Sequence, residues 1–205
     1  MVIFLRKRRK NSDKKATIIR AYNSTSHFYD QRYLTIQFDK YRFLLKNFKF
    51  NNKIILDAGC GTGLLYEYIM NSMNQELVDN MIYIAIDISQ NMLKAFKLKM
   101  NLSKQNKKHN INLILADLEN MPIRSDIFHG IFSLTSLQNL PNLKDGIVEL
   151  YRASKNNAEL RISILKKELK FEELSTFLKS MIKDLNIIDR ESIEDMIFQG
   201  STFKK

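Results

Sequence analysis

Residues 55–63 read ILDAGCGTG, in which an apolar run ends in three glycines at alternate positions, Gly59, Gly61 and Gly63. The chain has 205 residues and only six glycines, so half of them stand within five positions. Glycine adopts backbone conformations that other residues avoid, and it lets a ligand come close to the main chain. The stretch therefore predicts a strand, a ligand-binding turn and the start of a helix.

Apolar runs that alternate with helical segments decide the fold class. Runs typical of strands buried on both faces lie at 53–59, 81–89, 111–118, 127–137 and 159–165. Amphipathic stretches separate them, and two short closing strands are expected near 186–192 and 195–201. This alternation predicts an α/β fold of three layers, with a doubly wound, mostly parallel sheet of seven strands.

The N-terminal residues differ in composition from the rest. Residues 1–15 contain seven Lys and Arg and one Asp, a net charge of +6 out of +11 for the chain. We expect a disordered basic tail there, followed by one domain over 16–205 that begins with two helical pieces over 16–50. Such a tail either binds phosphates, as in RNA, or only keeps the protein soluble.

Cysteine content and hydropathy exclude several classes of protein. Cys60 is the only cysteine, so neither an internal disulfide nor a Cys-based zinc site can form, and we expect no bound metal. A reducing, cytoplasmic compartment fits this cysteine usage. We find no run of about 18 apolar residues and no secretory signal, so no membrane partner is expected.

Three acids stand where successive predicted strands end. Asp57 opens the glycine turn, Asp87 ends the second strand and Asp117 ends the third. In a doubly wound sheet this edge binds ligands. A carboxylate at the turn suits an ammonium group, the second suits ribose hydroxyls, and the third suits an adenine amino group. Jointly they predict a pocket for an adenosine that bears an amino-acid group, although each acid alone is also typical of a helix cap.

Two other nucleotide-binding turns do not fit. A dinucleotide fingerprint needs a third glycine where this chain has Leu64, which argues against an NAD oxidoreductase. A Walker phosphate loop needs a lysine followed by serine or threonine, which this turn lacks.

Four motifs carry a resemblance to a known family. ILDAGCGTG, AIDISQNML (85–93), LILADLENMPI (113–123) and IFSLTSLQNLPNLKDGIVELYRASK (131–155) together resemble the class I S-adenosylmethionine-dependent methyltransferases, type 11-like branch. The likeness extends over residues 16–200. It implies a Rossmann-like methyltransferase fold, S-adenosyl-L-methionine as cofactor, and methyl transfer as the activity.

The resemblance also implies a set of cofactor-binding residues. The glycine turn holds the methionine part of the cofactor, and the acid after the second strand holds the ribose. Two further residues, which follow that acid in the chain, flank the adenine. An N-terminal helix forms a lid over the cofactor. The implied residues are Tyr22, Tyr29, Asp57, Gly59, Gly61, Gly63, Asp87, Ile88, Met92, Asp117, Leu118, Ser133 and Leu134.

Several positions depart from the family pattern and leave the substrate open. His129 replaces a frequent aspartate, Gln138 and Asn139 stand where histidines are common, and residues 154–158 (SKNNA) lack the usual glycines. There is no N-P-P-[YF] motif after the fourth strand, which argues against methylation of a planar amino nitrogen. No cysteine nucleophile stands there either.

The acceptor therefore stays unidentified, with RNA and small molecules favoured. His27 in the lid segment is the candidate general base, whereas we expect His129 to point away from the pocket and His109 to lie in a solvated loop. The alternative is a non-catalytic cofactor-binding or scaffold protein. Some members of the resembled family also use a small activating partner protein.

Overall fold

The computed structural model describes the backbone of residues 2–102 and 110–204, and the side chains of 11–102 and 110–204. One seven-stranded sheet has the strand order β3-β2-β1-β4-β5-β7-β6. Only β7 runs antiparallel to its neighbours. This arrangement confirms the predicted doubly wound sheet. The strands are β1 (Ile54–Ala58), β2 (Ile82–Asp87), β3 (Asn110–Leu115), β4 (Phe128–Leu134), β5 (Ser154–Leu165), β6 (Ile182–Ile188) and β7 (Asp195–Thr202).

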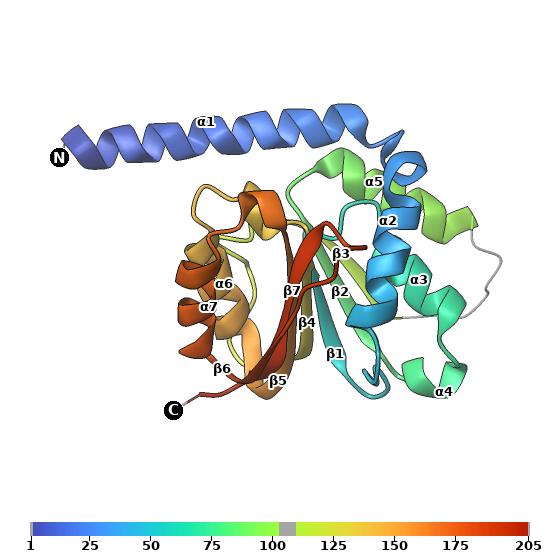
Figure 1. Cartoon of the computed structure of the whole chain (residues 1–205). Helices are drawn as coiled ribbons and strands as arrows, with labels where there is room; N and C mark the ends of the chain where they lie inside the picture. Colours follow the sequence, from blue (N-terminus) through green and yellow to red (C-terminus); the bar gives the residue numbers. More distant parts are fainter. Residues whose placement is uncertain (1, 103–109, 205) are drawn as a thin grey trace.

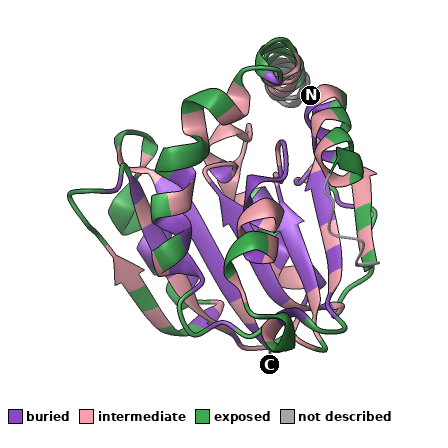
Figure 2. Ribbon diagram, turned by 90° about the vertical axis from the view of Figure 1, so that its right-hand side faces the viewer, coloured by how far each residue is buried: buried purple, intermediate pink, exposed green. Residues whose placement is uncertain are grey.

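Helices cover both faces of the sheet (Figure 1). One face carries α2 (Tyr29–Leu44), α3 (Leu64–Ser72) and α5 (Gln90–Leu102), and the other carries α6 (Leu143–Ala153) and α7 (Phe171–Lys179). The short helices α4 (Gln75–Val78), η1 (Leu137–Asn139) and η2 (Lys166–Glu168) lie in connections. Figure 2 shows the buried residues concentrated in the central strands, with exposed residues on the outer surfaces of the helices.

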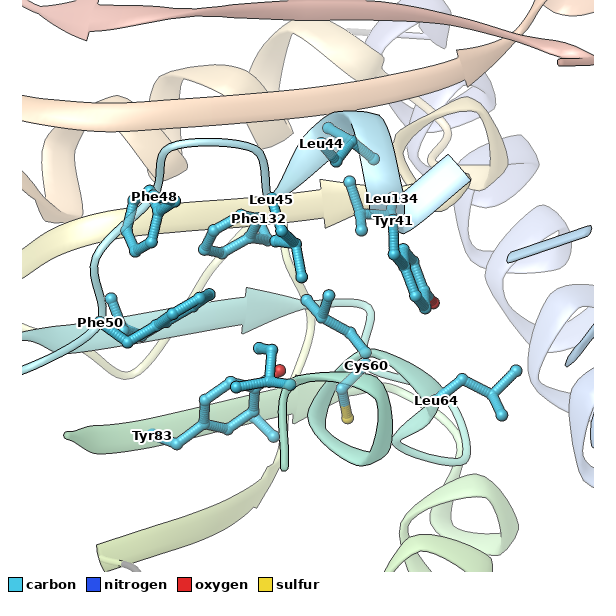
Figure 3. Close-up of a cluster of buried hydrophobic side chains, with 14 of the residues drawn as sticks. Tyr41, Leu44, Leu45, Phe48, Phe50, Cys60, Leu64, Tyr83, Phe132 and Leu134 are labelled. Carbon is cyan, nitrogen blue, oxygen red and sulfur yellow. The ribbon is translucent and has the colours of Figure 1, made fainter. Parts of the chain in front are cut away.

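Aromatic rings form much of the core on the α2 face. Phe132 of β4 lies edge-on to Phe48, with ring centroids 5.1 Å apart, and stacks on Phe50 at 5.8 Å (Figure 3). All three rings are buried. The segment after α2 therefore anchors that helix to the centre of the sheet, next to the strand that carries the glycine turn.

The first helix corrects the expected disordered tail. α1 runs from Val2 to Thr25, so residues 2–15 continue the helix that we expected to begin near residue 16. Neither glycine nor proline occurs in this stretch, and Lys and Arg are good helix formers. The prediction of disorder rested on the high charge of this segment alone and was therefore wrong. In Figure 1 the helix passes over the edge of the sheet where the parallel strands end.

The helical pieces also divide elsewhere than expected. The chain breaks between α1 and α2 at residues 26–28, inside the first predicted helical piece, which we expected over residues 16–33. The hydroxyls of Ser24 and Thr25 donate to the carbonyl of Ala21, and Ser26 donates to the carbonyl of Asn23. Such side-chain bonds compete with the helical ladder, which accounts for the break.

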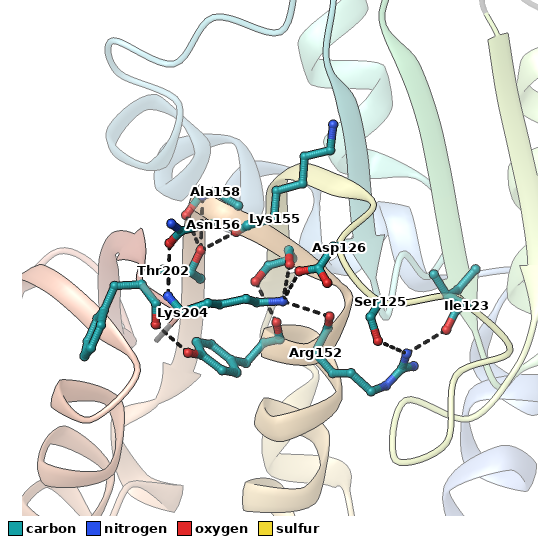
Figure 4. Close-up of polar contacts among 12 residues, drawn as sticks. Ile123, Ser125, Asp126, Arg152, Lys155, Asn156, Ala158, Thr202 and Lys204 are labelled. Atoms are coloured by element: carbon teal, nitrogen blue, oxygen red, sulfur yellow. Dashed lines mark hydrogen bonds and ion pairs between the residues drawn. The ribbon is translucent and has the colours of Figure 1, made fainter.

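The segment 154–158, which lacks the glycines usual in the resembled family and precedes the predicted fifth strand, is already part of β5. Asn157 adopts a left-handed conformation (φ 62°), which Asn tolerates better than most residues. Thr202 bonds the backbone on both sides of it, accepting from Ala158 N–H and donating to the Lys155 carbonyl (Figure 4). Asparagine thus replaces the missing glycine.

We predict that Phe132→Ala lowers the free energy of unfolding by about 3–5 kcal/mol, because it empties a fully buried ring site. Urea denaturation followed by circular dichroism measures this loss. Leu102→Ala, at a side chain that is 71% exposed, serves as the control and should change stability by less than about 1 kcal/mol. Equal losses in the two variants would contradict this view of the core.

Candidate functional site

A cavity of about 700 Å³ opens where β1, β2 and β4 end, beneath α1. Its position at the carboxyl ends of the strands is the usual ligand site of a doubly wound sheet. Its walls come from α1, the glycine turn, the segments after β2, β3 and β4, and η1. The lining residues are Lys15, Ile18, Tyr22, Tyr29, Gly59, Gly61, Asp87, Ile88, Met92, Asp117, Leu118, Leu134, Thr135, Ser136, Asn139, Leu140 and Pro141.

The glycine turn follows β1 and forms one wall. All three glycines have positive φ, and a Cβ at Gly59 would stand 2.4 Å from the Cβ of Ser136. At Gly63 it would stand 2.3 Å from the ring of Phe96. At Gly61, by contrast, no atom lies within 4 Å of the Cβ position. The outer glycines therefore permit close packing, and the middle one leaves open space on the cavity side.

Asp87 is held in place by backbone donors. Its carboxylate accepts hydrogen bonds from Gly61 N–H and Ser89 N–H, each at 2.8 Å. Burial raises the pKa of this carboxyl, and the backbone hydrogen bonds counteract that rise. The site thus holds an acceptor group at the end of β2, next to the glycine turn.

A lysine from α1 reaches the acids after β3. Lys15 forms ion pairs with both Asp117 and Glu119, and Glu119 N–H donates to Asp117 at 3.0 Å. Lys15 falls within the segment that we expected to be disordered. One face of α1 instead presents Lys15, Ile18 and Tyr22 to the cavity. Their i, i+3, i+7 spacing was the signal in the sequence that could have placed them.

Polar contacts fix the other end of α1 over the site. Asn139 of η1 donates to the Tyr22 hydroxyl at 2.9 Å. Asn23 accepts from the Ser89 hydroxyl at 2.7 Å and from Asn91 N–H at 3.2 Å, at the start of α5. The helix therefore covers the cavity as the lid that the resemblance implies.

The structure brings ten of the thirteen predicted cofactor residues to the wall of this cavity. Ile88, Met92, Leu118 and Leu134 form its apolar part, beside Tyr22 and Tyr29 from the lid helices. Thr135 and Ser136, which follow β4, also line it and were missed. They follow directly on the predicted pair Ser133 and Leu134. The prediction therefore named the right segment, but the residues that line the cavity begin one position later, at Leu134.

The other three predicted cofactor residues, Asp57, Gly63 and Ser133, are not among the residues that line the cavity. Asp57 is buried behind the turn and accepts a hydrogen bond of 2.8 Å from the Tyr83 hydroxyl. Ser133 donates to the Ala58 carbonyl at 3.0 Å, and Gly63 packs against Phe96. The three residues support the turn from within.

The buried position of Asp57 shifts its ionisation. Burial raises the pKa of this carboxyl to about 7, while the hydrogen bond from Tyr83 lowers it. A cation bound on the other side of the turn would favour the ionised form of this carboxyl and lower its pKa.

No histidine lines this cavity within the described residues. His27, the candidate general base, is exposed in the connection between α1 and α2, which argues against that role. His129 accepts from Ile54 N–H at the opposite end of the sheet, and its pKa is lowered by the burial of the imidazole and then by the nearby charge of Lys155. It points away from the site, as expected. His109 lies outside the described residues.

A second cavity adjoins the first, and we call it the outer cavity. It has a volume of about 1350 Å³ and extends from the end of α1 along α2 to the start of β7. Tyr22, Tyr29, Thr135 and Asn139 line both cavities. The two spaces therefore share a wall.

The first cavity, which we call the inner cavity, fits an adenosine cofactor with a cationic amino-acid group. Asp87 and Asp117 offer carboxylates at neighbouring strand ends, apolar side chains lie between them, and Gly61 leaves the main chain accessible. This combination defines the site as a nucleoside-cofactor site of a doubly wound enzyme.

Comparisons with known proteins identify the family. Residues 56–162 match the family model described as a methyltransferase domain. An uncharacterized protein of Methanocaldococcus jannaschii is 32% identical over 158 residues, which cover 75% of this chain and 60% of that protein. Malonyl-[acyl-carrier protein] O-methyltransferase of Hamiltonella defensa is 27% identical over 151 residues, 74% of this chain and 53% of the relative. The chain thus spans little more than half the length of these curated relatives.

Solved structures show the same fold. A putative S-adenosylmethionine-dependent methyltransferase from Methanococcus maripaludis superposes with a TM-score of 0.71 at 15% identity, covering 91% of this chain and 94% of that one. Magnesium protoporphyrin IX methyltransferase from Synechocystis, solved with bound S-adenosylmethionine, superposes with a TM-score of 0.70 at 16% identity, covering 92% of this chain and 97% of that one.

The chain belongs to the class I S-adenosylmethionine-dependent methyltransferases, in the type 11-like branch, with S-adenosylmethionine as its cofactor. Gly59, Gly61, Asp87 and Asp117 are the residues that would hold it. Within the described residues, no helix is long and apolar enough to cross a membrane.

We predict that Asp87→Asn weakens the binding of S-adenosylhomocysteine about 10- to 100-fold, because the variant keeps a carbonyl acceptor but loses the charge. Isothermal titration calorimetry measures the affinity. Asp189→Asn, at an exposed carboxylate paired with Lys166, is the matched control and should bind like the original chain. Unchanged affinity in Asp87→Asn would rule out this carboxylate as a ribose ligand.

A second prediction concerns pH. Because burial raises the pKa of Asp57 to about 7, the folded chain keeps a proton that the unfolded chain loses near 3.8. The stability linked to this proton is present below the unfolded pKa and is lost as the pH rises through 7. Between pH 5 and pH 8, the free energy of unfolding of Asp57→Asn should therefore fall less than that of the original chain, by on the order of 2 kcal/mol.

Denaturant titrations of the ligand-free protein at the two pH values test this. Asp39→Asn, which alters an exposed carboxyl, should retain the original pH dependence. An equal loss of stability between the two pH values in Asp57→Asn and in the original chain would contradict the raised pKa of Asp57.

Proposed function

We propose that the protein transfers the methyl group of S-adenosylmethionine to a small-molecule acceptor bound in the outer cavity. The observation that carries this proposal is the shared wall between the two cavities, formed by Tyr22, Tyr29, Thr135 and Asn139. A cofactor on one side and an acceptor on the other would meet along this wall.

The chain would act mainly by orientation and exclusion of water. When bound, S-adenosylmethionine supplies a methyl group that is already activated on a sulfonium. The lid helix covers the inner cavity, and the hydrogen bond from Asn139 fixes the Tyr22 hydroxyl on the shared wall. Holding two reactants in position is itself a large part of the rate enhancement for such a displacement.

The architecture supports a small molecule over RNA. The shared wall lies beneath α1 and α2, so an acceptor would have to enter a cavity to reach it. The curated relative from Hamiltonella defensa is named for malonyl-[acyl-carrier protein], which is not a nucleic acid. The excess positive charge of residues 1–15 then has no part in binding the acceptor.

We predict that replacing Arg6, Lys7, Arg8, Arg9 and Lys10 by Gln leaves methyl transfer to small molecules unchanged within about twofold. The protein is incubated with methyl-labelled S-adenosylmethionine and, separately, with the small-molecule, RNA and protein fractions of a cell extract. Label should enter the small-molecule fraction with both proteins.

Label that enters RNA, and that depends on these five residues and on low salt, would overturn the proposal in favour of an RNA acceptor. Labelling of no fraction by a chain that binds S-adenosylhomocysteine would favour the non-catalytic alternative.

A further inference from the structure

The floor of the outer cavity is a buried ion pair. Lys40 of α2 donates to Asp195 of β7 at 2.7 Å, and both side chains are at least 95% buried. Burial lowers the pKa of Lys40, while the neighbouring Asp195 counteracts this. Taking two charges out of water is costly, so their retention at a cavity floor points to a role beyond stability.

The same carboxylate fixes the residue at the junction of the cavities. Oδ2 of Asp195 accepts from the Thr135 hydroxyl at 2.7 Å and from the Ser163 hydroxyl at 2.6 Å, and Lys40 also donates to Thr135. Thr135 has a φ of 54°, which is rare for a β-branched residue and strains the backbone. The ion pair between Lys40 and Asp195 therefore fixes Thr135, a residue with a strained backbone, on the shared wall.

Two residues that line this cavity have a side-chain oxygen without a hydrogen-bond partner within the described structure. Oε1 of Gln37 and Oε1 of Gln138 are buried without a hydrogen bond, and both residues line the outer cavity. Gln37 is only 6% exposed. Both atoms are acceptors, so a ligand that satisfies them must donate from O–H or N–H groups.

The side walls of the outer cavity are aromatic. Tyr29 packs against Tyr33 at 4.7 Å and against Tyr22 at 6.3 Å, and all three line the cavity. Phe28, which is 69% exposed, stands at its edge. Rings of this kind favour a planar apolar ligand.

The charges that line the outer cavity nearly cancel, with Arg32, Lys40 and Lys167 set against Glu194 and Asp195. Lys40 is paired with Asp195, and the guanidinium of Arg32 lies 5.3 Å from the ring centre of Tyr33. Lys167 and Glu194 are both exposed lining residues, and their charges oppose one another.

We propose that the outer cavity binds an aromatic small molecule whose hydroxyl or amino groups donate hydrogen bonds to Gln37 and Gln138, above the floor of Lys40, Thr135 and Asp195. This inference rests on the proposed function, because it names the class of acceptor for the same site. It also gives a role to Gln138, one of the departures from the family pattern.

The test uses three fluorescent probes, hydroxyquinoline, aminoquinoline and methoxyquinoline, substituted at the same carbon. Each is titrated into the full chain saturated with S-adenosylhomocysteine. The hydroxyl and amino probes should bind about tenfold more tightly than the methoxy probe, which cannot donate from its substituent. The variant Gln37→Leu with Gln138→Leu should bind all three equally, with its affinity for S-adenosylhomocysteine unchanged.

Gln199→Leu is the matched control. Gln199 also has a buried side-chain oxygen without a partner in the described structure, but it lies in β7 and lines neither cavity. This variant should keep the tenfold preference.

Three results would overturn the inference: equal binding of the three probes by the original chain, a preference that survives in the double variant, or binding of none. A fourth probe, the carboxyquinoline substituted at the same carbon, is titrated in the same way, and its stronger binding would also overturn the inference by indicating an anionic acceptor. Failure of the original chain to bind S-adenosylhomocysteine would instead overturn the proposed function itself, and the calorimetry reveals this before any probe is added.

Discussion

The turn after β1 passes between neighbours that leave no room for a side chain at its first and last glycines. Ser136 lies against Gly59 and the ring of Phe96 lies against Gly63, so the segment after β4 and the helix α5 both pack directly on the backbone of the turn. This close packing places Asp87 within hydrogen-bond distance of Gly61 N–H. A β-carbon at either outer glycine would push apart the elements that form the cofactor cavity.

Much of this arrangement could be predicted because it follows from local rules. Continuous apolar runs indicate buried parallel strands, and alternate glycines after such a run indicate a ligand-binding turn. The carboxyl ends of parallel strands share one edge, which is why Asp87 and Asp117 could be placed together without a structure. Asp57 shows the limit of this reasoning, since its position at the turn did not reveal that its side chain points inward to Tyr83.

Other parts depended on contacts between distant segments. The charge of residues 1–15 suggested disorder, whereas Lys15 pairs with acids a hundred residues further along the chain. The ion pair between Lys40 and Asp195 joins α2 to the last strand, and no local pattern marks either residue. His27 had the right chemistry for a base and a plausible place in the sequence, but the break between the first two helices leaves it in solvent.

Cys60 sits within the glycine turn, where it is 8% exposed, and burial raises the pKa of its thiol well above the ordinary value. Because the thiolate is the reactive form, this sole cysteine will react slowly with alkylating reagents near neutral pH. A cysteine introduced at Ala21, on the exposed side of α1, would then be the one thiol that a maleimide dye modifies readily. The fold thus allows site-specific labelling of its own lid, so that opening and closing can be followed by fluorescence without removing any native residue from the turn.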